Sequence, residues 1–323
     1  MTNFSKTPLS LVEVVPQYAD MYRNIWSGHN TSSGGPQQNF SSYIISIFTS
    51  CVSIIGLVGN GIVICLLGFY IKRTPFTMYI LNLAVADFGA LLFGSIYDIL
   101  ILTDTKKLFW MIVFSEIAIF MYIASQLLLT AISIDRCVSV LFPFWHRWHR
   151  PRHLSIIVCA LIWVLSFLSS GSIALLGLLE HIQEYWTLLS PFIAAAVLCL
   201  PLVMISTMIL LFKVFCKSQQ PWRRRPLTIV FLTLLFFLVF AFPLNAIFTI
   251  NCFTDFKYSY LIIYGTLCAS FNSCVNPVIY FLVGRKKMGQ RRKSLKFLLQ
   301  RAFQEEEDHR EGQEQGTAAQ TSI

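Results

Sequence analysis

Long stretches of apolar residues, separated by short polar segments, dominate the pattern of this chain. Seven of them have the length of about 20 residues or more that a helix needs to cross a lipid bilayer. They cover Tyr43–Ile71, Thr77–Thr103, Phe109–Leu141, Leu154–Leu179, Tyr185–Cys216, Leu227–Ile250 and Tyr258–Val283. Hydrocarbon offers no water to satisfy backbone N–H and C=O groups, so each stretch is expected to be helical. The pattern predicts an all-α membrane protein, a bundle of seven transmembrane helices over residues 43–283.

Polar segments flank the predicted bundle and differ in character. Residues 1–42 form a polar N-terminal tail, and no charged and apolar leader opens the chain, so no cleavable signal peptide is expected. Residues 284–303 are basic with leucines at helical spacing, which predicts a short amphipathic helix on the inner leaflet of the membrane. Residues 304–323 are acidic and then polar, and we expect a disordered tail.

Composition agrees with a membrane protein. The 323 residues are 55% hydrophobic and 13% charged, whereas soluble domains average about 45–50% apolar and about 25% charged residues. Basic residues gather in the segments after the first, third, fifth and seventh stretches. Because such residues favour the cytoplasmic side, the N-terminus is predicted outside the cell and the C-terminus inside. The net charge of +9 then reflects a basic face beside anionic lipid, and no nucleic-acid partner is predicted.

The predicted outer tail carries N-x-Ser/Thr triplets at Asn3, Asn30 and Asn39. Their position on the extracellular side predicts glycosylation of at least one of them. Of the nine cysteines, most lie well inside the predicted helices and only Cys252 lies near the oxidising side. No extracellular disulfide is therefore predicted. The cysteine spacing does not resemble a zinc site, and no metal centre is expected.

Ionisable residues inside the predicted spans are few, and such residues are functional-site hypotheses by default. Asp87 lies in the middle of the second span. Polar side chains at similar depth are those of Ser125, Asn272, Ser273 and Asn276. Their oxygens, with the carboxylate, could hold a small cation such as sodium as an allosteric ion. The alternatives are a hydrogen-bonded cluster that only positions helices, or a protonated Asp87.

A second polar feature lies at the predicted cytoplasmic ends of the third and seventh spans. Asp135 and Arg136 end the third span, and "NPVIY" runs from Asn276 to Tyr280 in the seventh. A proline inside a helix removes a backbone donor and loosens the helix locally. Pro277, and Pro243 in the sixth span, are therefore predicted hinges.

These features together resemble the rhodopsin-like (class A) G-protein-coupled receptors over about residues 43–300. One matching motif falls in each span, in the family's order: "GN" at 59–60, "LNLAVAD" at 81–87, "DRC" at 135–137, Trp163, Pro201, Pro243 and "NPVIY" at 276–280. Longer stretches such as "KRTPFTMYILNLAVAD" and "LLTAISIDRCVSVLFPFWHRWHRPRH" resemble the Mas-related receptors.

The resemblance implies a cell-surface receptor that signals to a heterotrimeric G protein. It implies that Arg136 meets the C-terminus of the G-protein α-subunit in the active state and that Asp135 restrains Arg136 at rest. Asn276, Pro277, Tyr280 and Pro243 would form the activation hinges. Arrestin is a further candidate partner, and the terminal "TSI" fits the carboxylate ligand of a PDZ domain.

The chain departs from the family's pattern at several places. Asp135 stands where Mas-related receptors usually have Glu, and Ala241 stands where most rhodopsin-like receptors have a switch tryptophan. Many relatives carry an acidic residue at the base of helix six, where this chain has Arg223. With that second restraint missing, we hypothesise a weak resting lock and some ligand-independent signalling.

The resemblance to Mas-related receptors implies a ligand among basic peptides or small cationic compounds, or an orphan receptor. Ala118 stands where aminergic receptors carry an aspartate, so biogenic amines are not expected. Acidic candidates for ligand binding lie toward the outside at Asp98, Glu116, Glu184 and Asp255. Asp98 follows Asp87 by eleven residues, about three helical turns, so both share one helix face. For Glu184 and Asp255, a charge in a loop exposed to solvent is the simpler interpretation.

Other classes of membrane protein fit less well. The last span has no lysine for a retinal Schiff base, no internal repeat indicates a transporter, and the six histidines show no ligand spacing or catalytic constellation. No enzyme is therefore predicted. The remaining alternative is a seven-helix receptor that scavenges ligand without signalling. The intact Asp135–Arg136 pair favours the signalling receptor.

Overall fold

Every regular element in the described part of the chain is a helix, which confirms the all-α prediction. The computed structural model describes residues 36–71, 73–102, 108–142, 150–151, 153–178, 199–217 and 259–285, and single helical residues and short helical pieces between 232 and 247. The tail before residue 36 and the predicted amphipathic helix after residue 285 lie outside these ranges.

Six predicted spans correspond to long helices. Their bounds are Pro36–Cys65 for α2, which a π-helix η1 continues over Leu66–Tyr70, Pro75–Leu102 for α3, Leu108–Leu141 for α4, Leu154–Leu178 for α6, Leu200–Lys217 for α8 and Ser259–Arg285 for α10. The helical residues between 232 and 247 fall within the sixth predicted span. Four of the described helices, α2 with η1, α3, α4 and α6, are long and apolar enough to cross a membrane.

Local hydrogen bonds explain where helix α3 begins. The first helical residue of α3 is Pro75, whose missing N–H costs nothing at that position. The Thr77 N–H donates to Oγ1 of Thr74 at 3.2 Å, and the Thr74 N–H donates to Oγ1 of Thr77 at 2.7 Å. Helix α2 likewise opens on a proline, Pro36. It begins ahead of the apolar stretch predicted from Tyr43.

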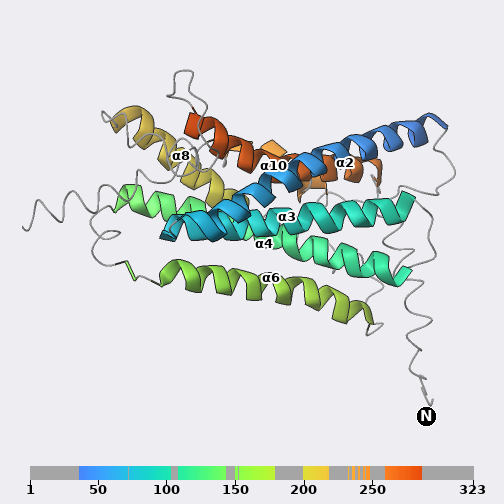
Figure 1. Ribbon diagram of the computed structural model, residues 1–323, viewed down its shortest axis with the longest axis horizontal. Helices are drawn as coiled ribbons and strands as arrows, with labels where there is room; N and C mark the ends of the chain where they lie inside the picture. The colour runs from blue at the N-terminus through green and yellow to red at the C-terminus, as the bar shows by residue number, and fades with distance from the viewer. Residues whose placement is uncertain are drawn as a thin grey trace, which may run out of the picture.

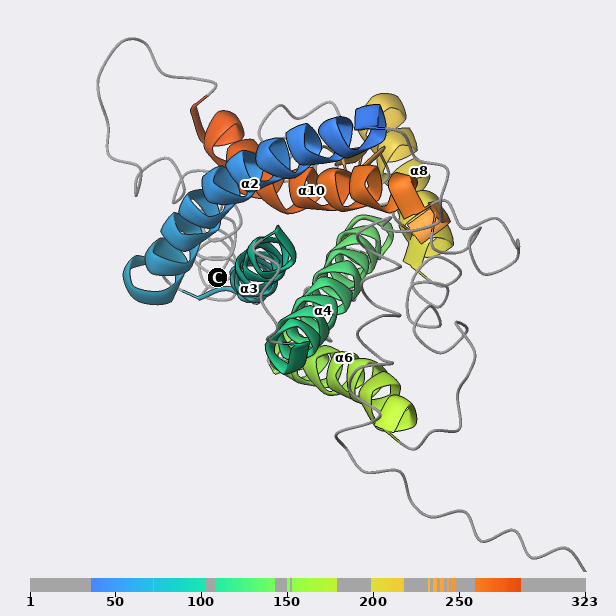
Figure 2. The ribbon, with the colours of Figure 1, turned by 90° about the vertical axis from the view of Figure 1, so that its right-hand side faces the viewer.

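The helices pack side by side, with α3 and α4 antiparallel at the centre (Figures 1 and 2). Helix α3 contacts α2, α4, α6 and α10, and α4 contacts α6 and α8 as well. The start of α3 and the end of α4 lie at one end of the bundle, called here the Asp135 end. The opposite end, where α3 finishes, is called the Asp98 end.

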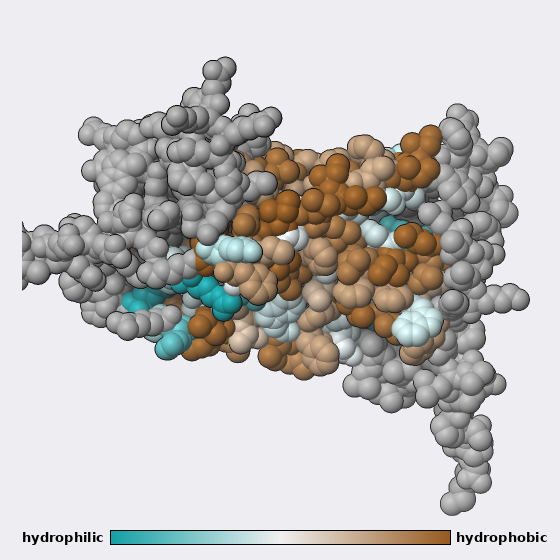
Figure 3. Space-filling model, in the orientation of Figure 1, coloured by the Kyte–Doolittle hydropathy of each residue, from teal (hydrophilic) through white to brown (hydrophobic). Residues whose placement is uncertain are grey.

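The distribution of polarity is that of a bundle in lipid. Large apolar side chains point outward: Phe69 is 82% exposed, Phe212 69% and Phe167 66%. Figure 3 shows this apolar surface as a broad brown band between the two ends of the bundle, with hydrophilic surface at the Asp135 end. Asn60, Asp87 and other polar residues are buried instead. A water-soluble fold would reverse this arrangement, so the described helices form a multi-pass membrane protein.

Two glycines let α2 approach its neighbours closely. A Cβ atom at Gly56 would lie 2.6 Å from Cδ1 of Leu91 on α3 and 3.3 Å from Cα of Cys274 on α10. A Cβ at Gly59 would lie 3.1 Å from Cβ of Pro277 on α10. Since lipid removes the hydrophobic drive for helix association, such close packing is a main source of stability.

We predict that Gly56→Ala destabilises the protein although alanine is the better helix former. Overpacking against the Cys274 backbone is expected to cost about 1–3 kcal/mol, seen as a lower melting temperature of the detergent-purified protein. The matched control is Gly61→Ala, whose Cβ would meet only Cε2 of Phe88 at 3.7 Å. Equal melting temperatures for the two variants would contradict the close-packing account.

Candidate functional site

Three groups of polar side chains in the described helices are candidates for function, and the first lies at the Asp135 end. Asp135 and Arg136 follow one another in the last turns of α4. Nη2 of Arg136 lies 3.6 Å from Oδ2 of Asp135, and the two side chains are 4% and 9% exposed respectively. The predicted pair is present, but its charged atoms are farther apart than in a close ion pair.

Two further residues lie beside this pair, and the four residues Phe76, Asp135, Arg136 and Arg150 are called here the inner cluster. Nη2 of Arg150 lies 2.8 Å from Oδ1 of Asp135, closer than Arg136 does. The guanidinium carbon of Arg136 lies 3.9 Å from the centroid of the Phe76 ring, a cation–π contact. Asp135 is therefore shared between two guanidinium groups, and Arg136 also lies against an aromatic face.

The second group lies in the middle of the bundle, where Asp87 accepts hydrogen bonds from two other helices. The Ser125 hydroxyl of α4 donates to Oδ1 at 2.7 Å. From α10, the Ser273 hydroxyl donates to Oδ1 at 2.9 Å and Nδ2 of Asn276 donates to Oδ2 at 2.8 Å. Asp87 is 0% exposed, so these donors replace the water that the carboxylate would otherwise need.

Of the predicted cation site, Asp87, Ser125, Ser273 and Asn276 lie together, as the bonds above show. The fifth candidate, Asn272, is buried on the same helix, but none of these hydrogen bonds comes from it. Asn60 extends the network to α2, because its Nδ2 donates to the backbone oxygens of Gly56 and Ser273, each at 3.0 Å. The second, third and seventh predicted spans therefore meet at one carboxylate, and the first is bonded to the same segment of α10.

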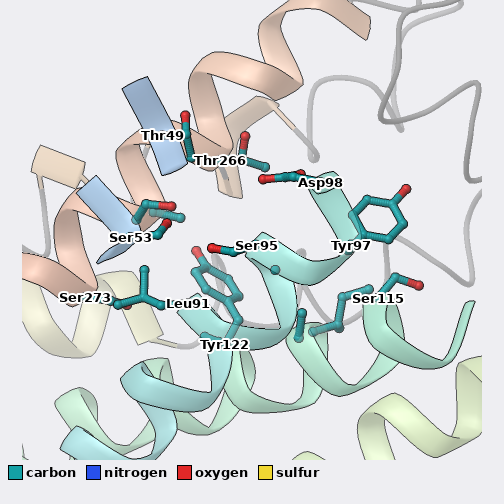
Figure 4. A pocket seen from close by; sticks show the side chains of 16 residues that line it. Thr49, Ser53, Leu91, Ser95, Tyr97, Asp98, Ser115, Tyr122, Thr266 and Ser273 are labelled. Carbon is teal, nitrogen blue, oxygen red and sulfur yellow. The ribbon is translucent and has the colours of Figure 1, made fainter. Parts of the chain in front are cut away.

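The third group lines a cavity of about 100 Å³ toward the Asp98 end. Helices α2, α3, α4 and α10 all line it, and many of the lining residues carry hydroxyl groups (Figure 4). The hydroxyl-bearing residues are Thr49, Ser53, Ser95, Tyr97, Ser115, Tyr122, Thr266, Ser270 and Ser273. Asp98 is the carboxylate among the described lining residues, and Figure 4 shows it on the side nearest Thr266.

Ser273 connects the cavity to the middle of the bundle. It lines the cavity, and its hydroxyl donates to Asp87. Asn276 and Pro277 follow within one helical turn, and Pro277 is the proline inside α10. Ser273, which forms the floor of the cavity, and the predicted hinge at Pro277 therefore belong to one helical segment of α10.

Glu116, a predicted ligand-binding residue, lies on a different face of α4. The Ser170 hydroxyl of α6 donates to Oε2 of Glu116 at 3.1 Å and lies 3.2 Å from its backbone oxygen. Glu116 is not among the cavity's lining residues, whereas Ala118 is. Asp98 and Glu116 therefore do not form one acidic site among the described side chains.

The structure describes only some of the remaining predicted residues. Tyr280 is buried in α10 and Pro243 is half-buried in one of the helical pieces between 232 and 247. Asn39 falls within α2. Glu184, Asp255, Asn3 and Asn30 lie outside the described residues, as do Ala241 and Arg223.

Sequence reasoning did not find the parts played by Phe76 and Arg150. Phe76 is an apolar residue in a membrane stretch, and nothing in the sequence separates it from its many apolar neighbours. Arg150 belongs to the basic segment after the third span, where contact with lipid phosphates is the ordinary expectation. The link between Asn82 and Trp163, whose Nε1 donates to Oδ1 of Asn82 at 2.9 Å, joins two motif residues that the sequence named only separately.

Comparisons with known proteins agree over most of the chain. The family model for the 7 transmembrane receptor (rhodopsin family) matches residues 59–280. Mas-related G-protein coupled receptor member B4 of Mus musculus is 34% identical over 306 residues, covering 89% of this chain and 94% of that protein. Member X1 of Homo sapiens is 36% identical over 277 residues, covering 83% of this chain and 85% of that protein. Member A1 of Mus musculus is 37% identical over 291 residues, covering 85% of this chain and 93% of that protein.

Proposed function

The chain belongs to the rhodopsin family of seven-transmembrane receptors and, within it, to the Mas-related G-protein-coupled receptors, and on that premise we propose how it signals. An extracellular ligand binds at the Asp98 end, and the Asp135 end activates a heterotrimeric G protein. The plasma membrane is the proposed location, with the N-terminus outside and the C-terminus in the cytoplasm. The basic segments after the first and third spans support this orientation.

The observation that carries the proposal is the state of Arg136. Its guanidinium is buried at the end of α4, 3.6 Å from Asp135 and against the ring of Phe76. Neither contact is a close, two-pronged ion pair, so the guanidinium can exchange them for carbonyl groups of an entering peptide. A G-protein α-subunit presents such a peptide, and this exchange is the proposed coupling step. Arrestin, a PDZ domain at the terminal "TSI" and inner-leaflet lipid remain proposed partners on the same side.

We propose that the ligand carries a positive charge that pairs with Asp98. The cavity holds this half-buried carboxylate among hydroxyl groups. Opposite charges attract more strongly in a partly buried site than in bulk water. A volume of about 100 Å³ accommodates one cationic group and not a whole peptide. A basic peptide would therefore insert a single side chain or its terminal amine.

We also propose sodium as an allosteric ion beside Asp87. The carboxylate and the hydroxyl oxygens of Ser125 and Ser273 are oxygen ligands of the kind that a small hard cation prefers. The hydroxyl hydrogens would turn away from the carboxylate to admit the ion.

Coupling through Arg136 is tested by screening basic peptides and cationic small molecules for G-protein dissociation in transfected cells. With an active compound, Arg136→Ala should reduce G-protein activation by about ten-fold or more, because charge-assisted hydrogen bonds are lost. The control is Arg73→Gln, which removes an equal charge from the exposed surface at the same end. Surface staining must be equal for all variants. A compound that binds the intact receptor and activates no G protein would instead identify a ligand-scavenging receptor.

The role of Asp98 is tested with the same active compound. Asp98→Asn should lower the potency of a cationic agonist by about ten- to a hundred-fold, because a hydrogen bond to a charged group is lost. Glu116→Gln makes the same charge change on the face toward α6 and should leave potency within about two-fold. Equal losses in the two variants, at normal surface expression, would rule out Asp98 as the specific anchor.

Sodium binding is tested by the melting temperature of the purified receptor in NaCl and in choline chloride of equal ionic strength. An ion that binds only the folded state raises the free energy of unfolding, so NaCl should raise the melting temperature by a few degrees. Asp87→Asn keeps the size of the side chain but loses the charge, and should abolish the difference. A salt effect of equal size in wild type and Asp87→Asn would refute the sodium site.

A further inference from the structure

The carboxylate of Asp135 is nearer to Arg150 than to its neighbour in sequence. Its Oδ1 lies 2.8 Å from Nη2 of Arg150, whereas its Oδ2 lies 3.6 Å from Nη2 of Arg136. Arg150 follows α4 and precedes α6, outside both helices. The segment between two helices thus supplies the closer partner of the residue expected to restrain Arg136.

Because the three charged side chains are buried, the sharing of Asp135 affects how strongly Arg136 is held. The side chains of Arg150, Asp135 and Arg136 are 6%, 9% and 4% exposed, so water screens their charges poorly. One negative charge is divided between two positive ones. The closer Arg150 lies to the carboxylate, the less of its attraction holds Arg136.

Phe76 provides Arg136 with a second contact. The guanidinium carbon lies 3.9 Å from the ring centroid, and Phe76 is 1% exposed, so the ring is fixed in place. It belongs to the first turn of α3, which the reciprocal Thr74–Thr77 hydrogen bonds hold. A desolvated cation–π contact of this kind contributes on the scale of an ion pair.

We propose that Arg150 is a positioning residue that draws Asp135 away from Arg136, so that the contact with the Phe76 ring gains weight in holding Arg136 at rest. The segment that carries Arg150 then sets how readily Arg136 is released. This inference rests on the proposed function, in which released Arg136 engages the G protein. It gives Arg150 and Phe76 opposite effects on ligand-independent signalling.

The two substitutions are tested in a nucleotide-exchange assay with purified receptor and an excess of G protein, without ligand. Phe76→Leu keeps an apolar side chain but removes the aromatic face, and should raise the basal exchange rate about three-fold. Arg150→Gln should lower the basal rate about three-fold, measured both alone and in the Phe76→Leu background, because Asp135 then pairs fully with Arg136. An unchanged or raised rate in both Arg150→Gln variants overturns the inference.

A double-mutant cycle separates this role from direct contact between Arg150 and the G protein. In an Asp135→Asn background, Arg150→Gln should cause no further change, because the carboxylate it acts through is already neutral. A three-fold loss that persists in that background overturns the inference. Arg73→Gln removes the same charge from an exposed position at the same end and should leave the basal rate unchanged. Arg150→Lys keeps the charge and should retain most of the wild-type rate.

Melting temperatures of the same variants, measured without G protein, separate failure of the inference from failure of the proposed function. Coupled groups give non-additive shifts for Asp135→Asn and Arg150→Gln, and we expect non-additivity here. Additive shifts overturn the inference even when the receptor signals. Non-additive shifts with no G-protein activation by any variant overturn the proposed function and the signalling role of Arg150, while the ion pair itself stands.

Discussion

The buried carboxylate of Asp87 fixes the relative positions of three helices. It is fully removed from solvent, and its hydrogen-bond donors come from Ser125 on α4 and from Ser273 and Asn276 on α10. An unsatisfied charge in hydrocarbon would be very costly, so the helices hold these donors in register. The same bonds fix the floor of the cavity on one side and the segment around Pro277 on the other. A structural change in the cavity and one at the hinge would therefore act on the same segment of α10.

Close packing between helices adds to the stability that the polar hydrogen bonds give the bundle. Lipid tails are as apolar as leucine, so burial of apolar surface gives little drive for one membrane helix to bind another. Gly56 and Gly59 allow close approach of α2 to Cys274 and Pro277 on α10, and the Trp163–Asn82 hydrogen bond joins α6 to α3. Both devices act at the interfaces of α3 and α10, the helices that Asp87 connects. The rigid part of the bundle is thus the part through which a ligand signal would pass.

The sequence predicts helices well and their rotations poorly. Apolar length identified the spans, and similar depth within them grouped Asp87 with Ser125, Asn272, Ser273 and Asn276. Ser125, Ser273 and Asn276 donate hydrogen bonds to Asp87, whereas none of these bonds comes from Asn272. Depth does not determine which way a side chain faces. Asp98 and Glu116 both lie toward the same end, yet one lines the cavity and the other meets Ser170. Arg150 shows the same limit, since no periodic pattern applies to a residue outside the helices, and nothing in the sequence predicts its pairing with Asp135.

The two-guanidinium arrangement changes the energetics of release at the Asp135 end. If Asp135 paired only with Arg136, releasing Arg136 would leave a buried carboxylate without its partner, at a cost of about 3–5 kcal/mol. With Arg150 at 2.8 Å, the carboxylate stays neutralised when Arg136 leaves. Arg136 also gives up its contact with Phe76, which an apolar or carbonyl surface of an entering peptide can replace. A switch built this way opens at low cost, and Arg150 controls that cost through its ion pair with Asp135.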